Sequence, residues 1–406
     1  MVLKVATREL AVSDFELIDH LPKNALVYLR GGSGLVGWGE AARLSASGPD
    51  RMQSLAKQWR QLASEAQVEN QLSISGTGLV AFGSFAFADQ SSAESVLIVP
   101  QIVLGARDGR VWLTEIDGGQ KPESMDFWST EQSYPAAHLN LTEGQFSAAE
   151  FKAAVAVSTQ KINAGELNKV VLARDLAADV PTDFDIRYAL KKFDELYDTC
   201  WIYSVDGTFG ASPELLVRVS HGQVSARVLA GTAGRGTDPG VDLAISAALA
   251  ESSKNLEEHR YAVDSLVSAL QPFCTQVDAD SKPFSLALPN VWHLASDVHG
   301  VLKEDSSAID LAAALHPTAA VAGTPKKLAL ELIAQLEPFD RGRYAGPVGW
   351  IGADGDGEWA IALRGGQLSE GIVRAFAGCG IVADSDAVAE LAETELKFKP
   401  IRAALQ

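Results

Sequence analysis

The final third of the chain contains Gly346-Pro-Val-Gly-Trp-Ile351, then Trp359-Ala-Ile-Ala-Leu-Arg364, then Val373-Arg-Ala-Phe-Ala377. Each run is short and apolar, and the residues between the runs are rich in glycine, as is typical of strands joined by turns. We predict strands over 346–351, 358–364 and 372–377, and a helix over residues 386–405. Strands that follow one another directly and then give way to a helix indicate an α+β fold.

The sequence before this stretch mixes strands and helices. Further strands are predicted at 25–29, 78–82, 95–99, 169–174, 200–210, 214–220 and 224–229, and helices at 142–164, 185–196, 241–271 and 325–337. Ser147-Ala-Ala-Glu150 matches the capping box that begins many helices. Met52, Leu55, Trp59 and Leu62 give one more helix an apolar face. We predict a single α+β domain over 1–406, with a strand-rich part at 1–140 and a more helical part at 141–406.

The composition excludes several classes of function. The chain has 406 residues and a formal net charge of -18, so we expect no binding to nucleic acid or to an anionic membrane, both of which need a basic surface. Its three cysteines are widely spaced, which favours a reducing cytosol over a disulfide framework. No apolar run reaches the roughly 18 residues of a membrane span, and the N-terminus has no apolar signal core. We therefore expect a cytoplasmic protein.

One motif resembles a nucleotide site. Gly32-Ser-Gly-Leu-Val-Gly37 matches the spacing G-x-G-x-x-G, which binds dinucleotides when a helix begins at the third glycine. Here Gly39 follows within the would-be first turn, so the sequence favours a glycine-rich strand or hairpin.

Carboxylates gather on two of the predicted helices. Glu390, Glu393 and Lys397 share one helix face beside an apolar stripe, and Glu257-Glu258-His259 lies on the other helix. Both sets are compatible with an ordinary solvated surface. If the two helices met, their carboxylates would suit Mg²⁺, which prefers oxygen ligands and keeps several waters.

Several residues lie where a strand meets a turn. Glu214 precedes a strand, and Gly231-Thr232 and Ala377-Gly-Cys-Gly380 are expected at strand ends, where backbone can approach a ligand closely. Arg364 ends an apolar strand. It is either an ion-pair partner or a bidentate clamp for a ligand carboxylate.

Together these segments resemble the chorismate-utilising enzymes, and among them the isochorismate synthases. The resemblance rests on Lys169–Arg174, Ser212–Leu216, Leu229–Thr232, Lys254–His259, Leu315–Thr318, Tyr344–Trp350, Trp359–Arg364, Ala377–Ser385 and Glu390–Lys397, which run in the family's order over about residues 150–406. It implies large antiparallel sheets flanked by helices, with the active site in a central cleft. It also implies a chorismate-binding enzyme with no obligate protein partner.

The resemblance assigns a role to each candidate residue. Glu258 and Glu393 are implied as direct Mg²⁺ ligands, with Glu390 reaching the ion through water. Gly231 and Thr232 would hold the ring carboxylate together with Mg²⁺. Tyr344, Arg364, Lys397 and the backbone of Gly378 and Gly380 would hold the substrate's carboxylates, and His293 would lie close to the ring. Asn255 stands where the family often has an acidic residue, which removes one possible water-mediated contact to the metal.

The implied reaction adds water at C2 of the ring and removes the C4 hydroxyl. Lys169 matches the family's general base and Glu214 its general acid. The pKa of a lysine base must fall, and the pKa of a glutamic acid that stays protonated must rise. The alternative is that Lys169 has no catalytic role and is an ordinary lysine at the start of a strand. Menaquinone and catechol-siderophore pathways both begin with isochorismate.

Other members of the family are the rival interpretations. Anthranilate and aminodeoxychorismate synthases use ammonia and usually lack a lysine at the position of Lys169, and the latter carry a lysine where Ala230 stands. Salicylate synthases share Lys169 and Glu214 but go on to eliminate pyruvate, and their segment usually differs from Thr318–Val321. A relative that binds chorismate without turning it over remains the alternative from a different class.

Overall fold

The computed structural model describes residues 2–12, 15–118, 134, 136, 138–236, 238–287 and 291–406, without the side chains of Thr232, Lys254 and Val291. The chain divides into two compact units. The first consists of Met1–Glu214, His316–Ala353 and Ala360–Gln406, and the second of Leu215–Leu315 and Asp354–Trp359. The first unit therefore contains both the strand-rich N-terminal part and the C-terminal helix.

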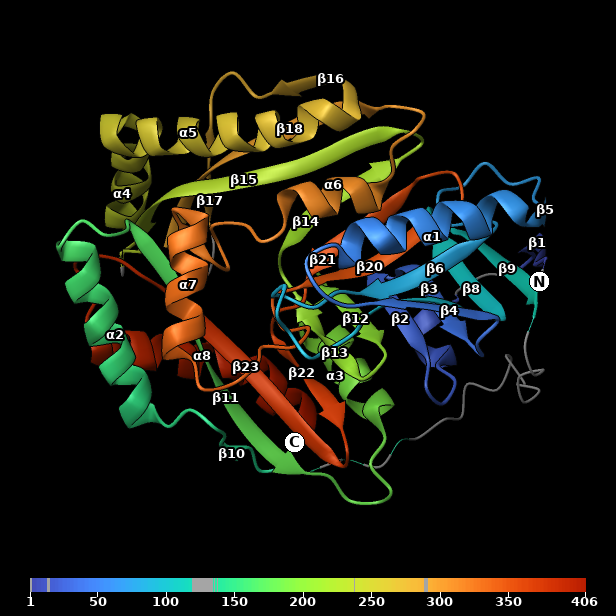
Figure 1. Cartoon of the computed structure of the whole chain (residues 1–406), viewed down its shortest axis with the longest axis horizontal. Coiled ribbons are helices and arrows are strands. Elements are labelled where there is room, and N and C mark those ends of the chain that lie inside the picture. The colour runs from blue at the N-terminus through green and yellow to red at the C-terminus, as the bar shows by residue number, and fades with distance from the viewer. Residues whose placement is uncertain are drawn as a thin grey trace. The chain divides into compact units, whose positions relative to one another are not determined.

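A large sheet organises the first unit (Figure 1). Over the described residues, its 13 strands run in the order β10 (Thr142–Glu143), β11 (Lys169–Asp179), β23 (Ile372–Ile381), β22 (Gly365–Ser369), β13 (Thr208–Ser212), β12 (Trp201–Val205), β2 (Leu26–Arg30), β3 (Ser33–Trp38), β8 (Ile102–Arg107), β9 (Arg110–Asp117), β1 (Lys4–Leu10) and β5 (Gln67–Glu69), with β19 (Gly323–Thr324) paired to β11. Neighbouring strands are antiparallel, except that β1 and β5 are parallel.

A second set of strands belongs to the same unit. β20 (Pro347–Gly352), β6 (Val80–Ser84), β7 (Ser95–Val99) and β4 (Ala42–Ala46) pair in succession, all antiparallel. Helix α1 (Arg51–Glu65) packs on β4 and β7, and its side chains Met52, Leu55 and Trp59 are buried. The helix predicted from this apolar face is therefore confirmed.

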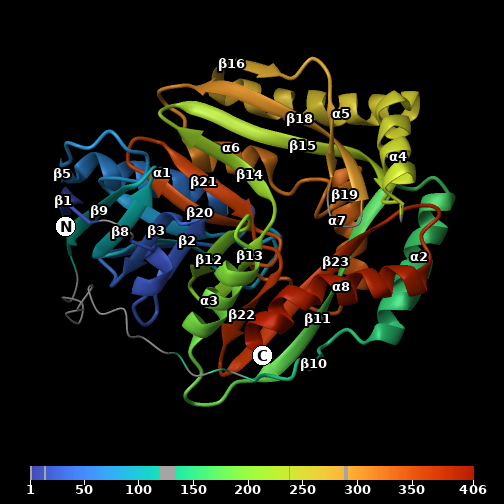
Figure 2. The ribbon, with the colours of Figure 1, turned by 180° about the vertical axis from the view of Figure 1, so that it is seen from behind.

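Four helices flank the strands that carry the candidate residues. They are α2 (Ala148–Asn163), α3 (Ile186–Leu196), α7 (Lys326–Leu336) and α8 (Ala387–Leu405). α8 lies across β23 (Figure 2), while α7 packs against β11. The capping box predicted at Ser147 and Glu150 is present at the start of α2. Phe398 and Ile401 of α8 are fully buried in the core beneath the sheet.

The start of α8 differs slightly from the prediction. The N-cap is Asp386, whose carboxylate accepts from the backbone N–H groups of Val388 and Ala389. Ser385, the residue before the N-cap, donates its hydroxyl to Glu390 at 2.6 Å. A cap residue must reach the second and third amides of its helix, and Asp386 alone has that spacing here.

The second unit contains one antiparallel group of strands. β16 (Cys274–Ala279), β18 (Val291–Leu302), β15 (Gln223–Gly234) and β14 (Leu215–Ser220) lie in this order, with β17 (Phe284–Ala287) also paired to β18. Its helices are α4 (Pro239–Glu251), α5 (Ser253–Leu270) and α6 (Ala308–Leu315), and α5 packs on β15 and β18 (Figure 1). β21 (Gly357–Ile361) begins in this unit and ends in the first.

Several predicted boundaries were wrong. The helix expected over 241–271 is broken at Ser252, whose extended backbone ends α4 and whose hydroxyl caps α5. The strand expected over 200–210 is the hairpin β12–β13, because Asp206 and Gly207 both have positive φ and reverse the chain. Helix α6 was not predicted.

The glycine-rich motif near the N-terminus forms a hairpin. Gly31 and Gly32 turn the chain with positive φ angles, and the residues after them form β3, which pairs with β2. The chain continues from the motif as a strand and not as a helix, so the predicted hairpin is confirmed. Within the described residues, no helix is long and apolar enough to span a membrane.

Candidate active site

Lys169 begins β11 and extends its side chain over a glycine of the next strand. Gly380 of β23 pairs with Val171, and a Cβ placed on Gly380 would lie 2.7 Å from Cε and 3.4 Å from Nζ of Lys169. Glycine at residue 380 leaves the space that the end of the lysine side chain occupies. The glycines at 378 and 380 were expected after their strand, but β23 continues to Ile381 and both lie within it.

Backbone hydrogen bonds hold Glu214, which lies between β13 and β14. Its carbonyl accepts from the Ile361 N–H at 3.0 Å, and its own N–H donates to the Ser212 hydroxyl at 3.2 Å. The same hydroxyl donates to the Ile361 carbonyl at 2.6 Å. The backbone next to the carboxyl group is therefore fixed on both sides.

The environment of Glu214 favours its protonated form. Burial raises the pKa of the Glu214 carboxyl above its usual value, although the charges of Lys169, Lys397 and Arg364 act in the opposite direction. These three cations belong to the same unit and act on one carboxyl group, so positive charge gathers here in a protein of net charge -18. A local cluster of this kind is what an anionic ligand would need in so acidic a protein.

Arg364 lies in the turn between β21 and β22. The strand that was expected to end at Arg364 ends at Ile361, and Arg364 itself has a φ of 54°, in the left-handed region. Non-glycine residues seldom adopt this region, and those that do are often at functional sites. Burial lowers the pKa of the guanidinium, while Tyr344, Cys200, Glu393 and Glu214 raise it. Arg364 therefore shares the environment of Glu214.

Tyr344 is buried in the turn that leads to β20. Its ring stacks on Phe376 of β23 with centroids 5.0 Å apart and planes 16° apart. Burial raises the pKa of the Tyr344 phenol to about 12, although Arg341 and Arg364 lower it. The phenol therefore remains a neutral hydrogen-bond donor at physiological pH.

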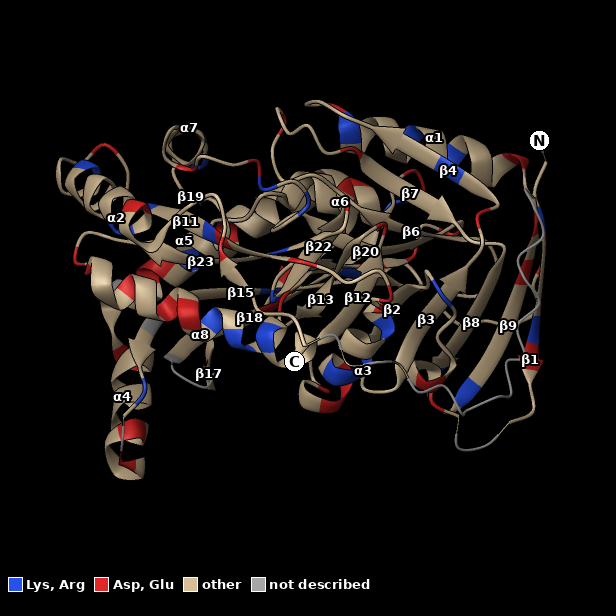
Figure 3. Ribbon diagram, turned by 90° about the horizontal axis from the view of Figure 1, so that it is seen from below, with Lys and Arg blue, Asp and Glu red and all other residues tan. Residues whose placement is uncertain are grey.

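Helix α8 presents acidic residues first and basic residues later (Figure 3). Lys397 forms an ion pair with Glu393 at 2.6 Å and donates to the Gly378 carbonyl at 2.7 Å. This i,i+4 ion pair lies on the helix face that the sequence predicted, and Lys397 also connects α8 to β23. Glu390 accepts from Ser385 through Oε1, whereas its buried Oε2 has no hydrogen-bond partner.

The α8 carboxylates fit a hard cation. A buried carboxylate oxygen without a partner is costly unless a ligand satisfies it, and Mg²⁺ would satisfy the oxygen of Glu390 directly or through water. Glu393, three residues along the helix, is half exposed and could supply a second oxygen. The described residues contain no group of three or more His, Cys, Asp or Glu side chains that could hold a metal. Mg²⁺ commonly uses one or two carboxylates and completes its shell with water and substrate.

The remaining candidates belong to the second unit. Gly231 lies inside β15, not at its end, where the pairing with β18 shifts between Ala230 and Thr232. Its φ of 79° is one that side chains rarely allow, so glycine is required at this bulge. Thr232 pairs with His293 of β18, which is half-buried. The side chain of Thr232 lies outside the described structure.

Helix α5 packs its first turn against this bulge. A Cβ on Gly231 would lie 3.3 Å from both Cβ and the carbonyl oxygen of Asn255. Glu258 follows one turn later and is exposed, whereas its neighbour His259 is buried. The structure thus brings Gly231, Asn255 and the start of the carboxylate-bearing helix together within the second unit.

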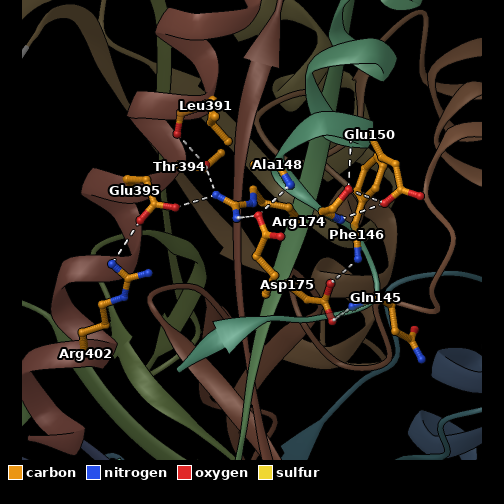
Figure 4. A network of polar contacts seen from close by, with 12 residues as sticks. Gln145, Phe146, Ala148, Glu150, Arg174, Asp175, Leu391, Thr394, Glu395 and Arg402 are labelled. Atoms are coloured by element: carbon orange, nitrogen blue, oxygen red, sulfur yellow. Dashed lines mark hydrogen bonds and ion pairs between the residues drawn. The ribbon is translucent and has the colours of Figure 1, made fainter. Parts of the chain in front are cut away.

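Sequence reasoning missed a polar network that joins β11 to α8 (Figure 4). Arg174, five residues after Lys169, is almost fully buried and donates to Glu395 at 2.6 Å and to Thr394 at 3.5 Å. Next to it, Asp175 accepts from the N–H groups of Gln145 and Phe146, both at 3.0 Å, just before α2 begins. The network fixes the strand of Lys169 relative to the helix of Glu390 and Glu393.

A buried ion pair, which the sequence analysis did not predict, forms hydrogen bonds with the backbone at the edge of β11. Between the short partners β19 and β10, the Ala173 N–H donates to Glu337 and the Val171 carbonyl accepts from Arg341, each at 2.7 Å. Glu337 and Arg341 pair at 2.6 Å, and the Arg341 carbonyl accepts from the Tyr344 N–H at 3.0 Å. One arginine thus links the strand of Lys169 to the turn of Tyr344. In the sequence, the ion pair is indicated only by the i,i+4 spacing of the two opposite charges.

Comparisons with known proteins identify the family. The protein-family model described as "Chorismate binding enzyme" matches residues 11–406. The chain therefore belongs to this family, as the resemblance implied. The match includes most of the N-terminal part, which the sequence motifs did not cover. The antiparallel α+β fold is that of the family.

Individual relatives are similar over most of their length. Isochorismate synthase MenF of Bacillus subtilis is 31% identical over 405 residues, covering 91% of this chain and 85% of that protein. Isochorismate synthase DhbC of the same species is 36% identical over 293 residues, covering 69% and 74%. The structure of MenF, the menaquinone-specific isochorismate synthase from Escherichia coli, has a TM-score of 0.79 and 25% identity, and covers 100% of this chain and 95% of that one.

Proposed function

We propose that this family member is an isochorismate synthase, an isomerase that converts chorismate to isochorismate, with Lys169 as base and Glu214 as acid. The observation that carries the assignment of roles is the pairing of these two residues in one electrostatic environment. Lys169 lies close enough to act electrostatically on the Glu214 carboxyl, whose pKa is raised by burial, and the lysine would serve as base in its neutral form. An exchange of hydroxyl groups needs a base where water attacks and an acid where hydroxide leaves, and this pair supplies both.

The two residues divide the proton transfers between them. Lys169 accepts a proton from water as its oxygen bonds to C2 of the ring. The double bond shifts, the C4–O bond breaks, and Glu214 donates its proton so that the C4 hydroxyl leaves as water. One water enters and one leaves, so the product is an isomer of the substrate. Proton exchange with solvent then restores both residues.

The cations and the neutral phenol bind the substrate's carboxylates. Arg364 can form two parallel hydrogen bonds to a carboxylate, and Lys397 and Tyr344 can each donate one. The backbones of Gly378 and Gly380 approach the same end of the substrate. Gly231, Thr232 and His293 hold the ring carboxylate and the ring itself. The family resemblance assigns Mg²⁺ to Glu258, Glu393 and, through water, Glu390, and the ion would neutralise carboxylate charge on the substrate.

Product analysis tests this proposal. The purified protein is incubated with chorismate and Mg²⁺, with and without ammonium, and the products are separated by liquid chromatography. We expect isochorismate in both samples and none in the presence of a chelator. Salicylate with pyruvate would instead identify a salicylate synthase, and an amino product that appears only with ammonium would contradict water as the nucleophile. Binding of chorismate without any product would favour a non-catalytic relative.

A further inference from the structure

His259 is a buried side chain that bonds to two strands at once. It lies on α5 directly after Glu258 and is only 2% exposed. Its Nδ1 lies 3.0 Å from the carbonyl oxygen of Ala230 on β15, and its Nε2 lies 2.9 Å from the hydroxyl of Ser296 on β18. The ring therefore connects the helix to both strands of the β15–β18 pair.

The partners of the ring define the hydrogen-bond directions. A carbonyl oxygen can only accept, so Nδ1 carries a proton and donates it to Ala230. In the neutral ring, Nε2 then accepts from the Ser296 hydroxyl. Both contacts of the imidazole are thereby satisfied, and the ring orientation is fixed.

The bond to Ala230 is made next to the bulge. Ala230 is the last residue before the register shift, and Gly231 follows it with positive φ. A bulge disrupts the strand ladder locally, and the bond from His259 to Ala230 supplies a contact from outside the ladder at this point. The close approach of Gly231 to Asn255 shows that the first turn of α5 packs on the same bulge.

We propose that His259 is a positioning residue that fixes the ligand-binding bulge at Gly231–Thr232 relative to the metal ligand Glu258. This inference rests on the proposed function, which gives the bulge a substrate carboxylate and Glu258 a metal ion. Because one side chain joins the two elements, its loss weakens the binding of both. Mutation of a side chain that orients a metal ligand without touching the ion itself typically changes the metal affinity 10- to 100-fold.

Two amide variants, each of which retains one of the two hydrogen-bonding positions of the ring, separate positioning from packing. In His259→Asn the amide nitrogen can take the place of Nδ1 and keep the bond to Ala230. In His259→Gln the longer side chain reaches toward Ser296 and loses that bond. Titration calorimetry measures the dissociation constants for Mg²⁺ and, at saturating Mg²⁺, for chorismate, and steady-state kinetics gives KM and kcat. His299→Ala, an exposed histidine on β18, is the control.

We expect His259→Asn to stay within about threefold of wild type in both dissociation constants. His259→Gln should weaken both about tenfold or more and raise KM more than it lowers kcat. Equal losses in the two variants would overturn the proposal, because a packing role does not distinguish them. Wild-type affinities in a folded His259→Gln protein would also overturn it.

Ser296→Ala keeps the test decisive if the histidine variants do not fold. It removes one hydroxyl from a strand, and we expect both dissociation constants to rise together by about threefold because the ring loses its second anchor. Unchanged constants would contradict the proposal. The wild-type titration comes first: a wild-type protein that binds chorismate without Mg²⁺, or forms no isochorismate, would show that the proposed function itself has failed.

Discussion

The side chain of Lys169 lies over the Cα of Gly380, so that a methyl group at residue 380 would come within 2.7 Å of the lysine Cε. The two residues lie on adjacent antiparallel strands, and the strand pairing fixes their positions. A glycine that was expected only to bring backbone close to a ligand also leaves room for the proposed base. This relationship leads to a direct test of the role of Lys169.

Gly380→Ala should lower kcat with little effect on folding. The Gly380 backbone does not need a positive φ, so alanine costs no backbone strain, but its methyl group displaces the lysine ammonium. A misplacement of about 1 Å can cost up to about 100-fold in rate. We expect chorismate still to bind, as judged by calorimetry, and the free energy of unfolding to change by no more than about 1 kcal/mol.

A double-mutant cycle with Lys169→Ala is the control. Lys169→Ala should nearly abolish water addition while chorismate still binds. In that background Gly380→Ala should cause little further loss of rate, because the atom it displaces is gone. A full additional loss would mean that Gly380→Ala acts on the substrate and not on the lysine, and normal turnover in Lys169→Ala would remove Lys169 from the role of base.

Glu214 should make stability and activity depend on pH. Because the folded-state pKa of its carboxyl is raised, its contribution to stability is present below about pH 4.5 and is lost as the pH rises through the folded-state pKa. Glu214→Gln cannot ionise, so its free energy of unfolding should increase relative to wild type as the pH rises above 4.5, as measured by urea denaturation.

The same variant should lose activity. An amide cannot donate the proton that the leaving hydroxyl needs, so we expect kcat to fall by at least about 100-fold. In wild type, kcat should decline at high pH as the acid ionises in the complex. A Glu214→Gln protein with normal turnover would exclude Glu214 as the acid.

Two adjacent glutamates on α5 test the metal site. Glu258→Gln should weaken Mg²⁺ binding about tenfold or more, because an amide is a poorer ligand for this ion than a carboxylate. Its neighbour Glu257, which accepts from the Tyr261 hydroxyl, serves as the matched control in Glu257→Gln. Glu393→Gln on α8 should lose Mg²⁺ affinity as well. Retained affinity in Glu393→Gln would mean that the carboxylates of the two helices do not share an ion.

The Glu337–Arg341 pair should matter for stability. Arg341→Met leaves the buried Glu337 carboxylate unpaired, which typically costs about 3–5 kcal/mol. The double variant Glu337→Leu/Arg341→Met removes both charges and should recover part of that free energy of unfolding, as measured by urea denaturation. A double variant less stable than the single one would show that the hydrogen bonds to Ala173 and Val171 outweigh the buried charge.

Periodicity and composition predicted much of the fold. The buried stripe of α1, the capping box of α2 and the strand that starts at Lys169 all follow from short-range patterns, because local propensity and side-chain burial agree there. The predictions failed where one residue's conformation decided the outcome. Ser252 divides a continuous helical pattern, and the turn at Asp206-Gly207 divides a continuous apolar run.

The sequence by itself determined the family and the residues that can carry its chemistry, because ordered motifs keep residue types that the reaction needs. It could not place a lysine over a glycine 211 positions away, nor join Arg174 to Glu395 or His259 to Ala230. Such contacts depend on strand register and helix packing, which bring distant segments to within a few ångströms. The raised pKa of Glu214 likewise depends on burial by the folded chain, so only the tertiary structure decided which candidates act on one another.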